Sequence, residues 1–429
     1  KPSRLLIKNI GGGSIKIDFQ GAENASEYIV LRGSLDIVGG LDTLGIYTDR
    51  PVIIDALNEG ETYFLSIAAK NSLGTSEPTE MLGVVPSSEQ VDFLIVNGFD
   101  RVSGTSNTFD FIRQHGSSIN SNGRAFDSAS NEAIIEEDIN IMNYQFVDWI
   151  LGEEGTSTSV FSNIEQNTLK TYLESGRFLF TSGSEIGYDL EAQGSSSDRE
   201  FYQNYLKADY ITDAAGGHQG VYSGYGTTSS IFNGITNITY DNGSHGTYDV
   251  DWPDGIKPLG GAILCAEYSN TDYNSRGGMG IEYTGTFGLG NNVGGLIYLS
   301  VGFETIYPES KRDEIMLKIL ELYDSQLGIE NNDMIQPSTM TIHSIYPNPT
   351  NTSFTILFST SKTNEPSQIS INDLLGREVY TTSIHKNNNL FKWTWDGLDN
   401  NGIIAPTGTY FVSIFHGNQI ETRKVTILK

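Results

Sequence analysis

The sequence predicts a multidomain fold: a β-sandwich, then an α/β domain on a parallel sheet, then a C-terminal β-sandwich. The chain has 429 residues, more than one domain of ~100–200 residues needs. Short alternating strands with Gly and Asn turns fill both ends of the chain. Between them, continuous apolar strands alternate with amphipathic helices. We therefore expect a first domain at 1–86, a second at 87–330, a linker at 331–340 and a third at 341–429.

Residues 1–86 carry the signals of the first sandwich. Alternating strands are predicted at 14–19 and 28–31. Tyr63 lies near the start of a later strand that ends in an Asn71-x-x-Gly74 turn, a pattern with which a sandwich pins its corner through a buried phenol hydroxyl. The segment resembles a fibronectin type III domain, and this resemblance implies a role in spacing or ligand contact.

Residues 87–330 change to an α/β pattern. Buried strands are predicted at 91–98, 176–183 and 295–302. Helices are predicted around 109–114, around 164–173 and at 310–327, and together they indicate a parallel sheet covered on both faces. Ligands of such sheets bind beyond the carboxyl ends of the strands. This rule places 97–100, 182–187 and 302–304 around one crevice.

A tight turn follows the second of these strands, with the sequence Gly183-Ser184-Glu185-Ile186-Gly187. A G-x-nucleophile-x-G elbow exposes its central side chain, and glycines are needed because the backbone is crowded there. The arrangement resembles the class I glutamine-amidotransferase-like fold, found in secreted Bacteroidota proteins labelled xanthan-lyase-like.

The chain departs from the amidotransferase pattern at both reactive positions. The family has Cys where this chain has Glu185, and its later His-x-Glu pair is replaced by Gly302-Phe303-Glu304. The single cysteine, Cys265, lies in an apolar strand pattern and is expected to be a packed thiol. We therefore do not expect thiolate chemistry on an amide.

A carboxylate at an elbow could instead act on a glycoside as base or nucleophile. The candidate partner acids for Glu185 are Asp189, Glu304 and Asp100. His218, in a Gly-rich loop, could serve as a general base. The alternative is that Glu185 caps its own helix or holds a polar ligand without reaction. Asp100, Ser184 and Asp189 are the expected lining of the crevice.

Three clustered carboxylates offer a weak calcium site. Asp249, Asp251 and Asp254 are oxygen ligands of the kind that Ca²⁺ accepts, but they lack the spacing of an EF-hand loop. No other cofactor is expected, because the sequence has no zinc spacing, phosphate loop or dinucleotide fingerprint.

The C-terminal segment carries five motifs in order. They are Tyr-Pro-Asn-Pro at 346–349, Asn-Asp-x-x-Gly-Arg at 372–377, Trp-Asp-Gly-x-Asp-x-x-Gly at 395–402, Pro-x-Gly-x-Tyr at 406–410, and a Lys-Val-Thr-Ile-Leu-Lys ending. Together they resemble the type A sorting domain of the type IX secretion system of Bacteroidota. The resemblance implies recognition by an outer-membrane translocon and its shuttle protein, and removal by a sortase. The positions expected to carry the signal are Tyr346, Pro347, Asn348, Pro349, Trp395, Asp396, Gly397, Gly408 and Tyr410.

The charge distribution narrows the choice of partners. The net charge of −27 repels nucleic acid and anionic lipid, so neither is expected to bind. Residues 87–334 hold most of this net negative charge, with 36 Asp and Glu against 12 Lys and Arg. This acidity indicates solubility, or attraction to a cation or to a cationic or neutral ligand.

No stretch reaches the ~20 apolar residues of a membrane span. The chain opens at Lys1 directly in a strand pattern, so we expect a fragment or a processed chain.

The resemblance implies an exported cargo, and three functions remain open for it. The first is glycan binding at the cell surface, in adhesion or gliding motility. The second is an enzyme that degrades polysaccharide or peptidoglycan through Glu185. The third is a structural stalk for a catalytic region upstream.

Overall fold

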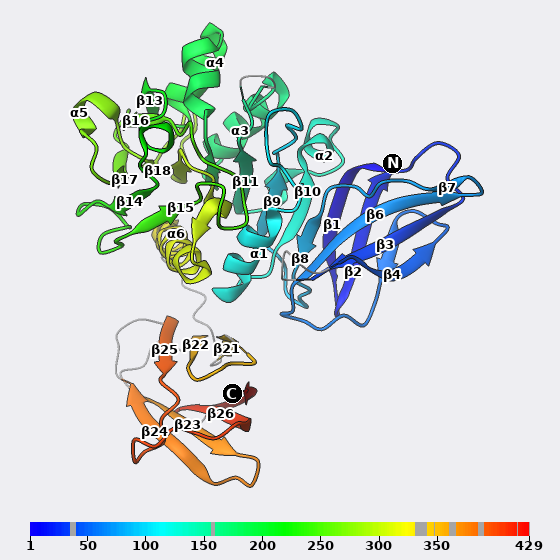
Figure 1. The fold of residues 1–429 in the computed structure, drawn as a ribbon, viewed down its shortest axis with the longest axis vertical. Coiled ribbons are helices and arrows are strands. Elements are labelled where there is room, and N and C mark those ends of the chain that lie inside the picture. The colour runs from blue at the N-terminus through cyan, green and yellow to red at the C-terminus, as the bar shows by residue number, and fades with distance from the viewer. Residues whose placement is uncertain are drawn as a thin grey trace. The chain divides into compact units, whose positions relative to one another are not determined.

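The computed structural model describes residues 1–34, 40–155, 159–330, 341–346, 348–359, 366–384, 390–417 and 419–428. The chain forms two compact units, one of residues 1–120 with 125–330 and one of residues 121–124 with 331–429. Each unit is described by itself below (Figure 1).

The first unit is built on one 13-stranded sheet, in the order β20-β15-β14-β17-β18-β19-β12-β11-β9-β10-β1-β2-β5. Its five central strands pair in parallel. They are β19 (Gly294–Leu299), β12 (Phe178–Gly183), β11 (Phe146–Gly152), β9 (Phe93–Asn97) and β10 (Asp127–Ser130). These strands are almost entirely buried, as expected of a parallel sheet covered on both faces.

Antiparallel strands extend the sheet on both sides of this centre. On the side of β19 they are β18 (Gly280–Gly285), β17 (Ile263–Tyr268), β14 (Ser223–Gly226), β15 (Ile238–Tyr240) and β20 (Ile306–Tyr307). On the side of β10 they are β1 (Ser3–Gly11), β2 (Ser14–Gln20) and β5 (Val52–Ile54). A separate antiparallel pair is formed by β13 (Ala208–Thr212) and β16 (Gly255–Pro258). The predicted parallel sheet is therefore the centre of a larger mixed sheet.

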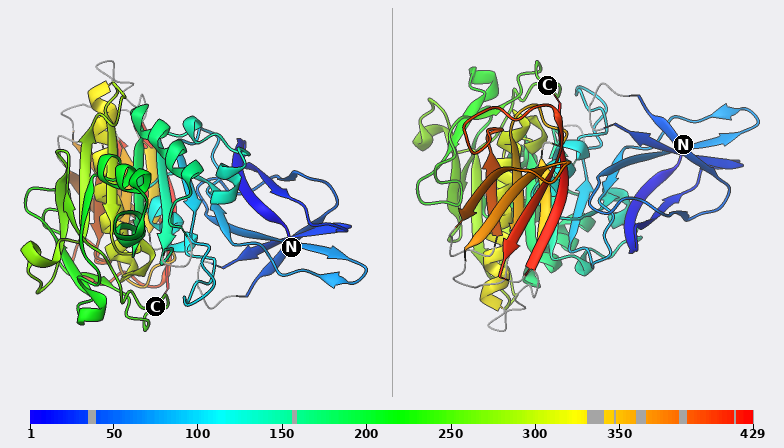
Figure 2. Two further views of the ribbon diagram at one scale, coloured as in Figure 1. Left: turned by 90° about the horizontal axis from the view of Figure 1, so that it is seen from above. Right: turned by 90° about the horizontal axis from the view of Figure 1, so that it is seen from below.

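Helices cover both faces of the central strands (Figures 1 and 2). On one face, α1 (Ile112–Ser121) and α6 (Glu309–Glu330) pack on side chains such as Phe93 and Phe178. The alternate side chains, such as Leu94 and Leu179, face the opposite helices. Those helices are α2 (Asn131–Ile135), α3 (Asn163–Glu174) and α4 (Ser196–Asn204). The remaining helical segments are α5 (Tyr273–Arg276), the short 3-10 helices η1 (Ile141–Asn143), η3 (Gly217–Gln219) and η4 (Phe303–Thr305), and the π-helix η2 (Tyr188–Gln193).

A second sheet completes the N-terminal sandwich. It has the order β4-β3-β6-β7, and β8 also pairs with β6. Its strands are β3 (Glu27–Gly33), β4 (Asp42–Tyr47), β6 (Tyr63–Asn71), β7 (Gly74–Thr75) and β8 (Leu82–Val84). The hydroxyl of buried Tyr63 accepts a hydrogen bond from the Asn58 backbone N–H at 3.0 Å, which is the corner contact that the sequence indicated.

One strand joins the sandwich to the central sheet. β1 pairs with β2 of the sandwich on one edge and with β10 on the other, where Leu6 lies opposite Ala129. The predicted boundary at residue 86 stays a prediction, but residues on both sides of it share one sheet and one compact unit.

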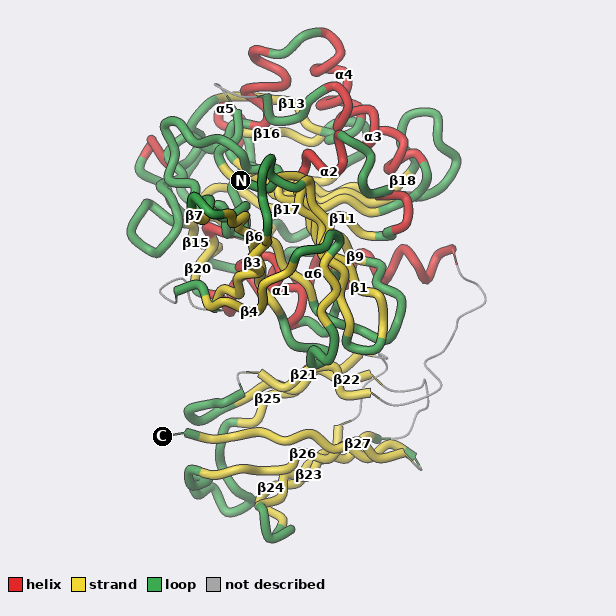
Figure 3. Tube along the Cα trace, turned by 90° about the vertical axis from the view of Figure 1, so that its right-hand side faces the viewer, coloured by secondary structure: helices red, strands yellow, loops and turns green. Residues whose placement is uncertain are grey.

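The second unit is a small sandwich of two antiparallel sheets (Figure 3). One sheet holds β21 (Thr341–Tyr346), β22 (Phe354–Ser359) and β25 (Leu390–Trp395). The other holds β24 (Glu378–Ile384), β23 (Ser367–Asp373), β26 (Gly408–His416) and β27 (Gln419–Ile427). Trp395 is among the largest side chains buried between them. In the described part of both units, no helix is long and apolar enough to span a membrane.

Candidate functional site

The elbow after β12 has the geometry that the glycine pattern indicated. Glu185 adopts φ of 62°, in the left-handed region, and the chain then turns into η2. A Cβ on Gly183 would lie 2.9 Å from the Gly152 carbonyl oxygen, and a Cβ on Gly187 would clash with the Tyr202 hydroxyl. Both glycines are therefore required by close packing, and they fix the turn that presents Glu185.

A cavity of about 340 Å³ opens beside this elbow. It lies among the loops that follow the carboxyl ends of β9, β11 and β12, where ligands of parallel sheets bind. The residues that line it are Arg101, Gly104, Glu153, Ser184, Glu185, Tyr188, Asp213, Asp251 and Trp252. We call this cavity the elbow pocket.

Four carboxylates face one guanidinium in the elbow pocket. Among the described lining residues, Arg101 alone has a basic side chain, and its Nη1 lies 3.3 Å from Glu185 Oε2. The same nitrogen donates to the backbone carbonyls of Glu153 at 2.9 Å and Gly155 at 3.2 Å. Arg101 therefore binds the loops after β11 and β12 to its own loop after β9.

Partial burial raises the pKa values of the four pocket carboxyl groups. Burial raises the pKa of Glu153 to about 7, although a hydrogen bond from Thr105 and the charge of Arg101 oppose the rise. Burial also raises the pKa of Glu185, and Arg101 again opposes it. The pKa values of Asp213 and Asp251 are raised in the same direction, first by burial and then by neighbouring acids. Glu153 therefore exchanges its proton near neutral pH, in the same pocket as Glu185 with its Arg101 partner.

An exposed aromatic ring adjoins these acids. Trp252 is 38% exposed, and its ring stacks on that of His218 with 4.3 Å between centroids and 15° between planes. His218, a candidate base from the sequence, therefore lies beside the elbow pocket through this contact.

Of the other residues expected around the crevice, Ser184 lines the pocket, whereas Asp100 and Asp189 are not among the described residues that do. Asp189 accepts a hydrogen bond from the Val160 backbone N–H at 3.0 Å. Burial raises the pKa of Asp100 to about 7, and the neighbouring Glu132 adds to the rise. Their proposed roles as partner acids stay predictions without support from this geometry.

Glu304 lies in the core and contacts a histidine that the sequence reading did not single out. His115 Nδ1 lies 2.8 Å from Asp148, and its Nε2 lies 3.1 Å from Glu304. The Tyr248 hydroxyl donates to the other Glu304 oxygen at 2.5 Å. Burial lowers the pKa of His115, but the two carboxylates outweigh it and raise that pKa to about 9. The signal in the sequence was Asp148, an acid inside an otherwise apolar strand, which requires a buried partner.

The three aspartates considered for calcium point to different places. Asp249 accepts from the Tyr222 hydroxyl at 2.7 Å, Asp251 lines the elbow pocket, and Asp254 is fully buried under the elbow, where it accepts from the Gly187 N–H at 2.6 Å. In the described ranges, no group of three or more His, Cys, Asp or Glu residues is arranged to hold a metal ion.

Sequence reasoning missed Arg101, Glu153, Asp213 and Trp252. Glu153 could have been found, because it directly follows the apolar strand β11 at the same edge of the sheet as the elbow. Cys265, in contrast, is buried as expected, and burial raises its pKa well above the ordinary thiol value.

Several residues of the predicted sorting signal hold the second sandwich together. The Tyr410 hydroxyl donates to the Pro406 carbonyl at 2.7 Å, and the Trp395 indole N–H donates to the Leu398 carbonyl at 2.8 Å. Asn348 binds β27 twice, donating to the Lys424 carbonyl at 3.0 Å and accepting from the Thr426 N–H at 2.9 Å. The Asn348 bonds tie the lead-in segment to the last strand, whereas the Tyr410 and Trp395 bonds close local turns.

The other signal positions shape turns and strand ends. Asp396 accepts from the Leu398 N–H at 3.0 Å, and Gly397 adopts φ of 82° in the same turn. Gly408 opens β26, Tyr346 ends β21, and Pro349 follows Asn348 through a cis peptide bond. Pro347 lies outside the described residues.

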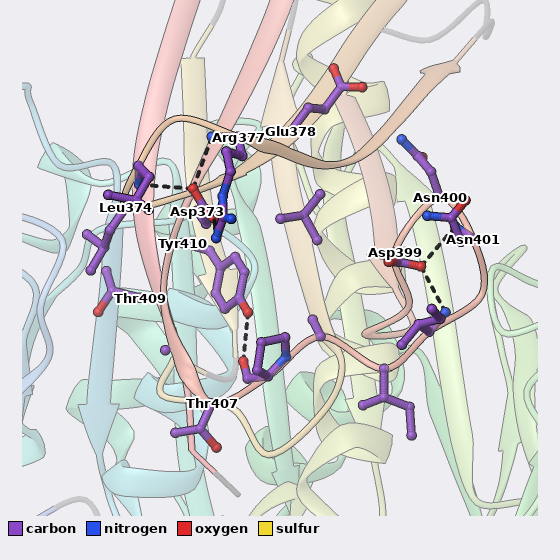
Figure 4. A pocket seen from close by; sticks show the side chains of 17 residues that line it. Asp373, Leu374, Arg377, Glu378, Asp399, Asn400, Asn401, Thr407, Thr409 and Tyr410 are labelled. Carbon is purple, nitrogen blue, oxygen red and sulfur yellow. Dashed lines mark hydrogen bonds and ion pairs between the residues drawn. The ribbon is translucent and has the colours of Figure 1, made fainter.

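A surface hollow of about 580 Å³ lies between two turns of this unit (Figure 4). One turn is closed by an ion pair between Asp373 and Arg377 at 2.7 Å. The other is closed by Asp399, whose carboxylate accepts from the backbone N–H groups of Asn401 and Ile403, both at 2.8 Å. Both turns thus use the short-range carboxylate bonds that Asp makes in tight turns.

Comparisons with known proteins identify this C-terminal unit. The family model described as the secretion system C-terminal sorting domain matches residues 344–428. No curated protein matches the chain at a significant level.

Solved structures align with about one fifth of the chain, at TM-scores too low to carry an argument. The fibronectin type III domain of human fibronectin type III domain containing protein 3 shows 16% identity, covers 20% of this chain and 85% of its own, and has a TM-score of 0.19. A Fn3-like protein from Clostridium thermocellum shows 17% identity, 19% and 86% coverage, and a TM-score of 0.18. PorZ, a surface component of the type IX secretion system of Porphyromonas gingivalis, shows 18% identity, 20% and 11% coverage, and a TM-score of 0.17.

The sorting domain itself shows that this chain is a cargo of the type IX secretion system, exported to the cell surface or the extracellular space.

Proposed function

We propose that the elbow pocket binds carbohydrate and that the exported protein captures glycans at or outside the cell surface, as in adhesion or gliding. The observation that carries the proposal is the exposed indole of Trp252 beside the four pocket carboxylates. Exposed aromatic faces offer flat apolar area to a sugar ring, and carboxylates accept hydrogen bonds from its hydroxyls.

The build of the pocket supports a binding role. Specific ligand sites combine apolar or aromatic walls with a few fixed polar groups. Here Trp252 and Tyr188 supply the aromatic surface, while Arg101 holds Glu185 in place. Because the elbow and its glycines are tightly packed, the polar groups are fixed before a ligand arrives, and this lowers the entropic cost of binding.

The binding proposal is tested with the full chain and a panel of neutral, acidic and amino polysaccharides. We expect retention of at least one glycan class, and loss of that retention in Trp252→Ala. The matched control is Phe411→Ala, which removes an equally exposed aromatic side chain, also 38% exposed, from the second unit. Unchanged retention in Trp252→Ala would place the binding elsewhere and contradict the proposal. If the intact chain binds none of the glycans, the result would favour the hypothesis that the protein is a structural stalk.

A second candidate, a polysaccharide-degrading enzyme, is favoured by one observation. The pKa of Glu153 is raised to about 7 by burial, while Glu185, in the same pocket, is paired with Arg101. A protonated acid beside an ionised carboxylate is the arrangement with which glycosidases cleave a glycosidic bond. In this reading Glu153 protonates the leaving oxygen, and Glu185 attacks the sugar or activates water.

The two candidates separate in one experiment. New reducing ends are counted during incubation with each glycan that the chain retains. An enzyme loses turnover in both Glu185→Gln and Glu153→Gln while its fold is kept, whereas a binding protein produces no new ends in any variant. Turnover that survives Glu185→Gln would rule out the elbow as the catalytic centre.

A further inference from the structure

We infer that the export machinery binds the sorting domain at the surface hollow between its two turns, and that Leu374 and Leu375 make the main contacts. The occupant of the hollow is a protein of that machinery with an apolar recess for these side chains. The inference is independent of the proposed carbohydrate binding, because it concerns the second unit alone. It follows from the build of the two turns, from the exposed side chains around the hollow, and from the charge of the chain.

The two turns that flank the hollow have the same build. Asp373 begins the first and Asp399 the second, and in each the Oδ1 atom accepts from the N–H groups two and four residues later, at 2.8–3.0 Å. A glycine follows three residues after each aspartate with a left-handed φ, 76° at Gly376 and 77° at Gly402. The aspartate and the glycine therefore fix each turn, without help from the two side chains between them.

The turns differ in the pair of residues at their tips (Figure 4). The second turn carries Asn400 and Asn401, a residue type that suits a tight exposed turn. The first carries Leu374 and Leu375, which are 65% and 78% exposed. An exposed leucine gains no burial of its apolar surface within the unit. Because the second turn closes with polar residues, the two leucines are not needed for the turn and are available for contact with another molecule.

Two more exposed apolar side chains line the same hollow. Ile403 and Ile404 are 64% and 58% exposed. The Asn400 backbone N–H donates to the Val379 carbonyl at 3.0 Å, and the Asn400 side chain accepts from the Thr381 N–H at 3.0 Å. These bonds hold the second turn against β24, which directly follows the first turn, so the apolar side chains are positioned before a partner arrives. Large apolar side chains gathered on one exposed face mark a protein contact site.

The charge and the family of this unit decide the occupant. A second copy of the chain would bring another net charge of −27, and a charge of that size keeps copies apart. Residues 335–429, in contrast, carry 7 Lys and Arg against 6 Asp and Glu, so a different protein can approach this unit without that repulsion. A sorting domain acts through recognition by the export machinery. The centre of such a contact is closed by complementary apolar surface on the partner.

The test gives the first turn the tip of the second. The double variant Leu374→Asn with Leu375→Asn keeps the aspartate and the glycine, so the turn is retained. The full chain is expressed in a bacterium with a type IX secretion system. Protease treatment of intact cells and immunoblotting of the medium measure the exported share. We expect that share to fall by at least about tenfold, because contact energy concentrates in a few central side chains, while the purified variant melts at the temperature of the parent chain.

Two further variants locate the effect. Ile420→Asn is the matched control, because Ile420 on β27 is 60% exposed in the same unit and is not among the described residues that line the hollow. It should be exported like the parent chain. Ile403→Asn alters the hollow from the second turn and should lower the exported share as well. It carries the test if the double variant melts below the parent chain.

Three outcomes overturn the inference. Export of a folded double variant at the parental level shows that the machinery binds another face of the unit. Retention of Ile420→Asn as strong as that of the double variant shows that export responds to any loss of apolar surface. In sedimentation velocity, a dimeric parent chain and a monomeric double variant would assign the hollow to a second copy of the chain.

Discussion

Arg101 Nη1 lies 3.3 Å from Glu185 Oε2, and the two side chains are 15% and 14% exposed. The contact crosses between two loops that are 84 residues apart in the sequence. Because the same nitrogen also binds two backbone carbonyls after β11, one side chain organises three loops of the elbow pocket.

Replacement of Arg101 should therefore affect stability as well as binding. We expect Arg101→Gln to lower the free energy of unfolding by about 1–3 kcal/mol, because it leaves partly buried acceptors without a charged donor. It should also weaken glycan retention. The measurement is chemical denaturation followed by fluorescence. The control is Arg32→Gln, which breaks a more exposed ion pair with Glu61 and should cost at most about 1 kcal/mol. Equal effects of the two changes would contradict the organising role.

The buried His115 should be costly to remove from the first unit. His115→Ala leaves Asp148 and Glu304 in the core without their cationic partner, and we expect a loss of about 3–5 kcal/mol in the free energy of unfolding. His218→Ala is the control, because His218 lies at the rim of the elbow pocket on Trp252. A loss below about 1 kcal/mol in His115→Ala would show that the two acids are protonated and need no cation.

His115 also predicts how stability depends on pH. Its pKa rises from 6.5 to about 9 on folding, so its contribution is fully present below pH 6.5 and is lost as the pH rises through 9. We therefore expect the melting temperature to fall between about pH 7 and pH 9, and to fall less steeply in His115→Gln. A slope that is identical in the variant would assign the pH dependence to other groups.

The raised pKa of Asp100 also predicts a pH dependence of stability, at lower pH. Burial and the nearby Glu132 raise the pKa of Asp100 from 3.8 to about 7, so the folded state holds a proton that the unfolded state releases. Its contribution to stability is present below pH 3.8 and is lost as the pH rises through 7. Asp100→Asn should thus raise stability by on the order of 1–2 kcal/mol at about pH 8 and change little at about pH 4. Destabilisation at about pH 8 would show that the ionised carboxylate is needed.

The corner tyrosine of the second unit can be tested without altering its core. Tyr410→Phe removes the hydrogen bond to the Pro406 carbonyl, and we expect a loss of about 1 kcal/mol in the stability of this unit. The control is Tyr380→Phe, since the described contacts of Tyr380 with Trp393 and Trp395 are made by its ring. Similar melting temperatures for Tyr410→Phe and the parent chain would show that water replaces the bond.

The export signal is tested by truncation. Removal of residues 341–429 from the expressed gene should leave the protein inside the cell envelope, because the sorting domain lies there. Immunoblotting of envelope and culture fractions measures the distribution. Appearance of the truncated chain outside the cell would show that another segment directs export.

Local patterns were enough to predict much of the fold. The predicted helix at 310–327 is α6, and the strand predicted at 176–183 is β12. Both segments have a continuous apolar or amphipathic pattern, which can be recognised without knowing which elements pack against them. The helix expected around 109–114 begins at Ile112 instead, because Phe109 takes φ of 58° and cannot continue a helix. The antiparallel strands β14 and β15 are only four and three residues long, too short for a clear alternating pattern.

The site was predictable only where chemistry and local geometry coincide. Glu185 was found because two glycines and a preceding strand mark its turn. Trp252 and Asp213 lie in loops. They are brought to the elbow by the packing of β13 on η2, by the pairing of β13 with β16 and by the bond between Asp254 and Gly187, none of which can be recognised from sequence spacing. His115 was hidden because a histidine on a helix has many roles, and its two acidic partners come from distant parts of the sequence, Asp148 from β11 and Glu304 from η4.

The pairing of β1 with β10 also governs how the chain must fold. During synthesis β1 gains its second partner only when residues 128 and 129 have been made, so one of its edges stays open while much of the central sheet is still missing. Such non-local pairing slows folding and leaves an unpaired edge that can join another chain. Proteins cut near residue 86 should accordingly self-associate, and soluble production of the sandwich requires a boundary that includes β10.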